Sequence, residues 1–130
     1  MKIINLTPHT VNFYHTKDLL ELGKPGSNQW GLPLGGATPY LSLEPTTNPA
    51  TAPRVGVNHV PAGELGGVPL FRAAFGTVYN LPAPVEGTIY IVSALVYNAA
   101  PDRKDLATVL GGVKDLMGKM CGCVGLAVRE

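Results

Sequence analysis

The stretch 87-GTIYIVSALVYNAA-100 decides the fold expected for this chain. As far as Val92 it is rich in β-branched and aromatic residues, which is typical of a buried strand. The pattern changes at Ser93, which is a good helix N-cap, and Pro101 cannot continue a helix. The sequence therefore predicts a central strand that runs directly into one short helix over residues 93–100.

Upstream of this centre, residues 54–60 alternate apolar and polar side chains, which predicts a strand. Residues 68–75 are predicted to form the next strand, which ends at Gly76 and is continued by residues 77–79. Gly66 and Gly67 lie between them and predict a tight turn. Further short strands are expected at residues 2–6, 10–14 and 40–43.

Downstream, Asp102 followed by Asp105 resembles a weak, acidic version of a capping box. We therefore expect a second short helix that runs to Leu110 and ends at the glycine pair 111–112. Residues 117–128 are predicted to form a last strand or strand hairpin.

The composition agrees with a sheet. The chain has 130 residues, enough for one domain spanning 1–130, and it contains 16 Gly and 12 Pro. Because Gly and Pro oppose helix interiors, an all-helical protein is excluded. The predicted fold class is α+β, a single domain dominated by an antiparallel β-sheet, with one or two short helices after the central strand. Residues 23–53, rich in Gly and Pro, are expected to form a loop or insertion within it.

The charge content limits the classes of partner that the protein is expected to bind. Charged residues make up 15% of the chain and the formal net charge is +1, so the basic excess of a nucleic-acid duplex binder is missing. No apolar run reaches the length of a membrane span, so no membrane partner is expected. The cysteines, Cys121 and Cys123, make no disulfide framework, which favours a cytoplasmic location.

Catalytic patterns are weak. The histidines His9, His15 and His59 lack metal-ligand spacing, and the two cysteines lack companion ligands. We expect no metal, no cofactor and no catalytic residue, hence a binding protein and not an enzyme. A Cys–His nucleophile remains an open alternative.

The few arginines of the middle of the chain are the candidates for binding an anion. Period two places Arg72 among apolar neighbours on one strand face, where a guanidinium needs a partner. That partner is either an internal acid, Glu64 or Glu86, or an anionic ligand, unless the side chain is solvent-exposed. Arg54 begins a strand, and either ends in solvent or binds the same ligand.

The segment after the central strand adds further candidates. Arg103 opposes the dipole of the expected second helix, so it pairs with Asp102 or Asp105 or binds a ligand. Four more residues each have a binding and a structural interpretation. Ser93 either marks a phosphate-binding strand-to-helix junction or caps the helix, and Asn98 either reads a base through its amide or is the C-cap. Tyr97 and Phe75 either offer an aromatic face to a base or pack in the core.

Several stretches of the chain resemble, in the same order, those of a family of small phage proteins, the first-described Thoeris anti-defence family. The match covers about half of the chain. The resembling stretches are residues 4–11, 75–84, 87–93, 100–106 and 122–123.

The resemblance implies a sponge that sequesters cyclic ADP-ribose-type immune signals, and in some members cyclic oligonucleotides, without cleaving them in the infected bacterial host. It also implies a homo-oligomer, either a dimer or a hexamer assembled from dimers. A pocket between subunits would suit a short chain that must enclose its ligand. The stretch 23–53 is longer than the family usually carries. Phe75, Ser93 and Arg103 lie in the resembling stretches, whereas Arg54, Arg72, Tyr97 and Asn98 are inferred from chemistry alone. The alternatives are a structural or assembly protein of a phage particle and a small hydrolase of cyclic nucleotides.

Overall fold

The expected central strand lies between two parallel neighbours. The structure, a computed structural model, describes residues 1–129, and the Phe75 side chain lies outside the described part. Strand β8 (Thr88–Ile91) pairs in parallel with β1 (Lys2–Asn5) on one side and with β9 (Leu106–Lys114) on the other. Strands that are covered on both faces read as continuous apolar runs, which explains the composition of this segment.

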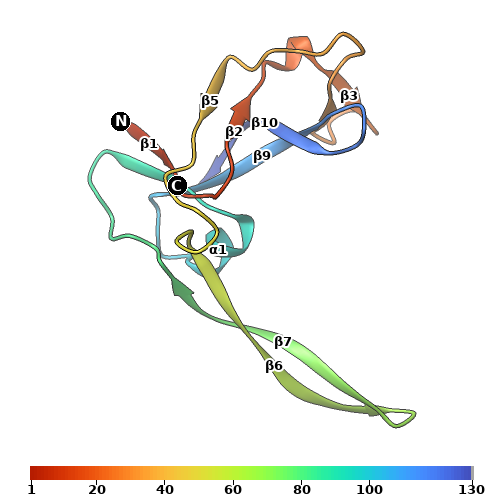
Figure 1. The fold of residues 1–130 in the computed structure, drawn as a ribbon, viewed down its shortest axis with the longest axis vertical. Helices are drawn as coiled ribbons and strands as arrows, with labels where there is room; N and C mark the ends of the chain where they lie inside the picture. Colours follow the sequence, from red (N-terminus) through yellow and green to blue (C-terminus); the bar gives the residue numbers. More distant parts are fainter. Residues whose placement is uncertain (130) are drawn as a thin grey trace.

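Two sheets contain all the strands (Figure 1). The larger, eight-stranded sheet has the path β1-β8-β9-β10-β2-β5, and β4 joins it at β9 with β3 beside it. The smaller sheet is a two-stranded arm of β6 and β7 that projects from the body of the molecule. The other elements are β2 (Val11–Phe13), a 3₁₀ turn (Thr16–Asp18), β3 (Leu20–Leu22), β4 (Gln29–Gly31), β5 (Leu41–Leu43), β6 (Arg54–Leu65), β7 (Val68–Tyr79), α1 (Ala94–Ala99) and β10 (Met120–Val128).

The core divides into two clusters on the two faces of β8. Alternate side chains of a strand point to opposite faces, so Tyr90 and Val92 join one cluster and Ile91 joins the other. The first cluster, called the α1 cluster, consists of Leu6, Tyr90, Val92, Val96 and Leu106. The second, called the β2 cluster, consists of Val11, Phe13, Ile91 and Cys123.

Asn5 joins the two ends of the strand path. Its side chain is 2% exposed and lies between β1, the first strand of the path, and the end of β5, the last. Asn5 Nδ2 donates to the carbonyls of His9 (2.7 Å) and Leu43 (2.9 Å). Asn5 Oδ1 accepts from the backbone N–H (3.0 Å) and the hydroxyl (2.6 Å) of Thr7. The backbone carbonyl of Asn5 also accepts two bonds from Thr46, so the segment after β5 is tied to the end of β1.

The strand-dominated α+β fold class is confirmed, and two details differ from the sequence-based prediction. The sheet is mixed, because four strand pairs, β1–β8, β8–β9, β10–β2 and β4–β9, are parallel. The prediction of a second helix is wrong, because from residue 106 the chain forms β9, which pairs with β8 and β10. Two neighbouring strands offer this apolar segment a hydrogen-bonded ladder on both edges, which outweighs a weak capping signal.

The stretch 23–53 is only partly the loop that its composition predicts. It contains β4 and β5, and β4 pairs with β9 through Trp30 opposite Val113. The remaining predicted elements, α1, β5, β8 and the hairpin around Gly66 and Gly67, are present.

We expect Asn5→Leu and Asn5→Asp each to lower the free energy of unfolding by about 3 kcal/mol, because each leaves buried polar groups of the turn and of β5 unsatisfied. Aspartate keeps the acceptor but cannot donate to the carbonyls of His9 and Leu43. Urea unfolding monitored by circular dichroism measures the loss. The exposed Asn58 of the arm provides the control, and equal effects of Asn58→Asp and Asn5→Asp would contradict the role given to Asn5.

Candidate functional site

The structure places four of the seven predicted ligand residues around α1 and the other three on the strands of the arm. Tyr97 and Asn98 are on α1 itself, Ser93 precedes it, and Arg103 follows it. Arg54 starts β6, one of the two arm strands against which α1 packs. Arg72 lies farther out on β7, opposite Val60, and is exposed. Phe75 pairs with Val57 in the backbone register, and its side chain lies outside the described part.

Helix α1 is capped as its sequence predicts. The Ser93 hydroxyl accepts a hydrogen bond from the Val96 N–H at 3.3 Å, so this side chain serves as the N-cap. Tyr97 packs against the α1 cluster, and Asn98 is exposed. The C-cap is Ala100 and not Asn98, so the capping alternative for Asn98 is wrong and its amide faces solvent.

Arg103 is paired with an internal carboxylate. Its Nε donates to Asp105 Oδ1 at 2.8 Å, and its Nη2 donates to Asp105 Oδ2 at 2.7 Å and to the Pro82 carbonyl at 2.8 Å. This is the single ion pair among residues 1–129. The bidentate pairing raises the pKa of Arg103 and lowers the pKa of Asp105. The pairing alternative from the sequence is therefore confirmed with Asp105 as the partner.

A second arginine, Arg129, which the sequence reasoning missed, contacts the backbone of Arg103. The Arg129 guanidinium carbon sits 3.8 Å from the centroid of the Tyr97 ring, a cation–π contact. Its Nη1 donates to the Arg103 carbonyl at 3.2 Å, and its Nη2 donates to the Tyr97 carbonyl. The signal available in the sequence was an arginine directly after the apolar strand β10, although its partners lie more than twenty residues away.

The base of the arm supplies a third cation. Arg54 is exposed and lies over the ring of Tyr79, 5.3 Å from its centroid, in the strand pair where the two residues are opposite each other. Val55 and Val78, the next residues of the two strands, pack against the α1 cluster. Because consecutive strand residues point to opposite faces, Arg54 and Tyr79 lie on the face of the arm that is turned away from the α1 cluster. Arg72 forms no ion pair with Glu64 or Glu86, both described residues, and remains on the exposed arm.

A cleft of about 500 Å³ opens on the other side of Ser93. Its walls are mainly apolar, with Val109 from β9 and Met120 from β10, and its rim carries hydroxyl groups. A Cβ on Gly122 would approach Cε2 of Tyr14 to 2.6 Å, so glycine permits the close packing of β10 on β2 at this point. The lining residues are Thr7, Pro8, His9, Thr10, Val11, Ser93, Val109, Met120, Cys121 and Gly122.

The surroundings of Cys121 in this cleft disfavour the thiolate form of its side chain. Burial raises the pKa of its thiol above the ordinary 9.0, and the neighbouring Asp115 charge acts in the same direction. The thiol is therefore protonated at neutral pH, whereas the thiolate is the nucleophilic form. The lining of the cleft, mainly apolar with the hydroxyl groups of Thr7, Thr10 and Ser93, suits a largely apolar group that carries a polar edge.

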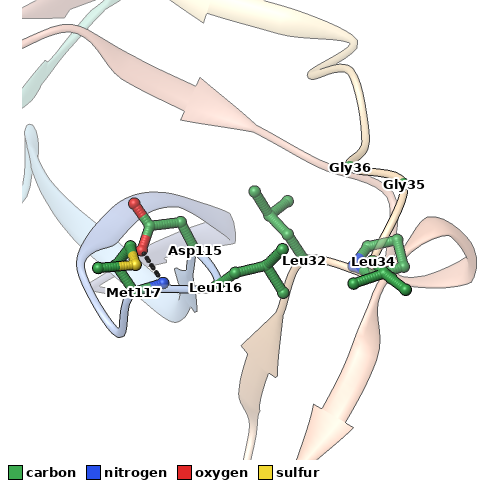
Figure 2. Close-up of a pocket in the computed structure, with 8 residues that line it drawn as sticks. Leu32, Leu34, Gly35, Gly36, Asp115, Leu116 and Met117 are labelled. Carbon is green, nitrogen blue, oxygen red and sulfur yellow. Dashed lines mark hydrogen bonds between the residues drawn. The ribbon is translucent and has the colours of Figure 1, made fainter.

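A second depression, of about 420 Å³, lies between the β9–β10 turn and the segment after β4 (Figure 2). Leu32, Leu34, Leu116 and Met117 form its walls, and the Asp115 carboxylate is occupied by the backbone N–H of Met117 at 2.9 Å. None of the sequence-predicted residues lies here. Its lining is apolar, without an unoccupied charged group.

Residues 1–129 contain no group of three or more His, Cys, Asp or Glu side chains placed to hold a metal ion. No helix in the described part of the chain is long and apolar enough to cross a membrane. Comparisons with protein-family models, with curated proteins and with solved structures give no match for this chain.

The Arg103–Asp105 pair makes a pH-dependent contribution to stability. Because pairing lowers the pKa of Asp105 in the folded chain, the contribution is fully present above the ordinary value of 3.8 and is lost as the pH falls through the lowered folded value. Asp105→Asn should therefore lower the free energy of unfolding at pH 7 by about 2 kcal/mol and reduce the difference between pH 7 and pH 3.

Urea unfolding at the two pH values checks this expectation, with the exposed Asp102→Asn as the matched control. An Asp105→Asn chain that loses as much stability on acidification as the unaltered chain would contradict it.

Proposed function

We propose that this protein binds and sequesters a small cyclic nucleotide of the cyclic ADP-ribose type, without cleaving it, in the cytoplasm of a phage-infected bacterium. The observation that carries the proposal is the Arg129 guanidinium over the Tyr97 ring, held there by the backbone carbonyls of Arg103 and Tyr97. The resemblance to the Thoeris anti-defence family supplies the ligand class, and the geometry around α1 supplies groups that suit it.

Such a ligand carries a pyrophosphate, two riboses and an adenine. A pyrophosphate is bound by planar guanidinium groups, and a base stacks on an aromatic ring or on a guanidinium plane. The Arg129 guanidinium, whose central carbon lies 3.8 Å from the centroid of the Tyr97 ring, is a candidate for the second kind of contact and carries a positive charge. The exposed amide of Asn98 follows Tyr97 directly on α1.

Arg103 keeps donors for a ligand even though Asp105 holds it. The contacts with Asp105 and Pro82 use Nε and Nη2, and Nη1 has no acceptor among residues 1–129. Pairing also fixes the orientation of the guanidinium, which reduces the entropy lost when a ligand binds. The internal pair therefore holds the Arg103 guanidinium in one orientation, while the Asp105 carboxylate offsets its positive charge.

Retention without cleavage agrees with the chemistry of the described side chains. Cleaving a pyrophosphate or a glycosidic bond requires an activated nucleophile or a general acid–base pair. The raised pKa of Cys121 keeps its thiol protonated, and the Asp105 carboxylate is committed to Arg103. Both properties favour binding over hydrolysis.

A direct retention experiment tests the proposal. The purified chain is incubated with cyclic ADP-ribose isomers, separated from free ligand by gel filtration, and heated to denature it. We expect intact ligand in the supernatant, identified by mass spectrometry. Chemically altered ligand would replace the proposal by a hydrolase, and no retained ligand would overturn it in favour of an assembly protein of a phage particle, the candidate that the exposed apolar arm favours.

Substitution of Arg129 tests the site itself. Arg129→Gln removes the charge and the stacked plate, so we expect ligand affinity to fall roughly tenfold or more, the equivalent of one charge-assisted contact. Arg129→Lys keeps the charge without the plane and should lie in between.

Isothermal titration calorimetry measures the affinities, and Lys119→Gln, in the turn between β9 and β10, is the matched loss of charge elsewhere. Equal affinities for Arg129→Gln and Lys119→Gln would remove Arg129 from the site. Melting temperatures of all variants are recorded to separate binding from folding.

A further inference from the structure

The cleft beside Ser93 is not used by the proposed nucleotide site, which is built around Tyr97 and Arg129. Its volume of about 500 Å³ lies within the roughly 300–1,000 Å³ that is typical of small-molecule pockets. Three separate parts of the chain line it: the turn at residues 7–11, Ser93 at the start of α1, and the strands β9 and β10. Because the sheet and the hydrogen bonds of Asn5 hold these parts in place, a ligand does not have to order them.

A bulge in β10 makes one wall of the cleft apolar. The register of β10 on β9 shifts between Met120 and Gly122, so the consecutive residues Met120 and Cys121 both line the cleft. Regular alternation would turn them to opposite faces of the sheet. Val109 on β9 also lines the cleft, and the side chains of Val109 and Met120 are 46% and 58% exposed. Apolar side chains that stay this exposed in a concave site suit the apolar body of a ligand.

The charge at the rim of the cleft comes from Glu44. Thr10, which lines the cleft, donates from Oγ1 to Glu44 Oε2 at 3.2 Å. The β2–β5 register pairs Val11 with Leu43, so its continuation places Thr10 opposite Glu44, and cross-strand neighbours project from the same face. The Glu44 carboxylate forms no ion pair with any of residues 1–129. An unpaired negative charge therefore lies one hydroxyl group away from the cleft.

The cleft is poorly suited to an anion. Among the described residues that line it there is no lysine or arginine, and the one imidazole, that of His9, is exposed to solvent. At the opposite wall the charge that acts on the Cys121 thiol is the negative charge of Asp115, which helps to raise the pKa of that thiol. A phosphate group would therefore meet the field of two carboxylates and no guanidinium, whereas a cation is attracted.

We infer that this cleft binds a small arylalkyl amine, with its apolar body against Val109 and Met120 and its ammonium group at the rim beside Thr10 and Glu44. The ammonium donates to the Thr10 hydroxyl oxygen and to the Glu44 carboxylate, since both oxygens keep lone pairs for it. The Met120 thioether favours an aromatic body, because sulfur packs well against the edge of a ring. The inference does not rest on the proposed function, because the nucleotide is assigned to arginines on the other side of α1.

A matched series of probes tests this inference. Tryptamine carries an ammonium group, tryptophol a hydroxyl and indolepropionate a carboxylate on the same ring system. The three methionines of the chain are Met1, Met117 and Met120, so isotope labelling of their methyl groups gives one NMR reporter in the cleft and two outside it. We expect the Met120 resonance to shift saturably with tryptamine while the Met117 resonance stays unchanged. Because the rim is exposed to solvent, Kd should favour tryptamine over tryptophol by roughly fivefold, and indolepropionate should bind more weakly than either.

Substitutions separate the charge from the shape of the cleft. Glu44→Gln keeps the shape and removes the charge, so the affinity for tryptamine should fall to that for tryptophol. Glu64→Gln, near the tip of the arm, is the matched control and should leave the preference unchanged. Val109→Phe fills the cleft and should abolish binding of all three probes, with circular dichroism to check folding. If that variant does not fold, Val109→Ser replaces it and should weaken all three probes.

Five outcomes would overturn the inference: no probe shifts Met120, Met117 shifts along with it, tryptamine and tryptophol bind equally, indolepropionate binds best, or Glu44→Gln leaves the preference for tryptamine intact. The fourth outcome would mark the cleft as a site for anions. The titrations use the chain without nucleotide, and retention of cyclic ADP-ribose isomers is measured on separate samples. A failure of the proposed function and a failure of this inference are therefore distinguishable.

Discussion

The buried amide of Asn5 is the contact on which the arrangement of the sheet depends. The strand path begins at β1 and ends at β5, and a side chain with two donors and a doubly used acceptor connects the two ends. An apolar residue could fill the same space but could not satisfy the carbonyls of His9 and Leu43. A fully satisfied polar group in a dry environment specifies one arrangement, because every alternative leaves it unpaired. The curled shape of the sheet and the position of the turn after β1 follow from this contact.

Both features of the candidate site are consequences of that framework. The turn held by Asn5 contributes Thr7 to the cleft, and β8 ends where Ser93 starts α1, so one residue borders both the cleft and the cationic region. On the far side of α1, Arg103 binds Asp105 and the backbone carbonyl of Pro82. Arg129, from the end of the described chain, binds the backbone carbonyl of Arg103. The guanidinium of Arg103 is directed by Asp105, and that of Arg129 is directed by two backbone carbonyls. The result is two arginines held by the chain around α1, one of which lies over the aromatic ring of Tyr97.

Sequence reasoning succeeded where the information is local. The β-branched run before Ser93, the hydroxyl that caps α1, and the glycine pair between β6 and β7 each act within a few residues, and each was predicted correctly. It failed at residues 102–110, where the capping pattern suggested a helix. There β9 is stabilised by pairing with β8 and with β10, and neither pairing can be read from that segment alone. In the site, the pairing of Arg103 with a nearby acid was among the expected alternatives, whereas the contact of Arg129 with Tyr97 was not foreseen.

By itself, the amino-acid sequence determined a strand-dominated domain with one capped helix, a long hairpin and few charges, because propensity, capping and turn formation are short-range effects. Only the tertiary structure decided which strands run in parallel, which cations meet at α1, and that the hairpin leaves the body with both faces uncovered. These properties depend on contacts between residues that are far apart in the chain. Such contacts form only when burial of the two core clusters and closure at Asn5 outweigh the entropy of bringing the segments together.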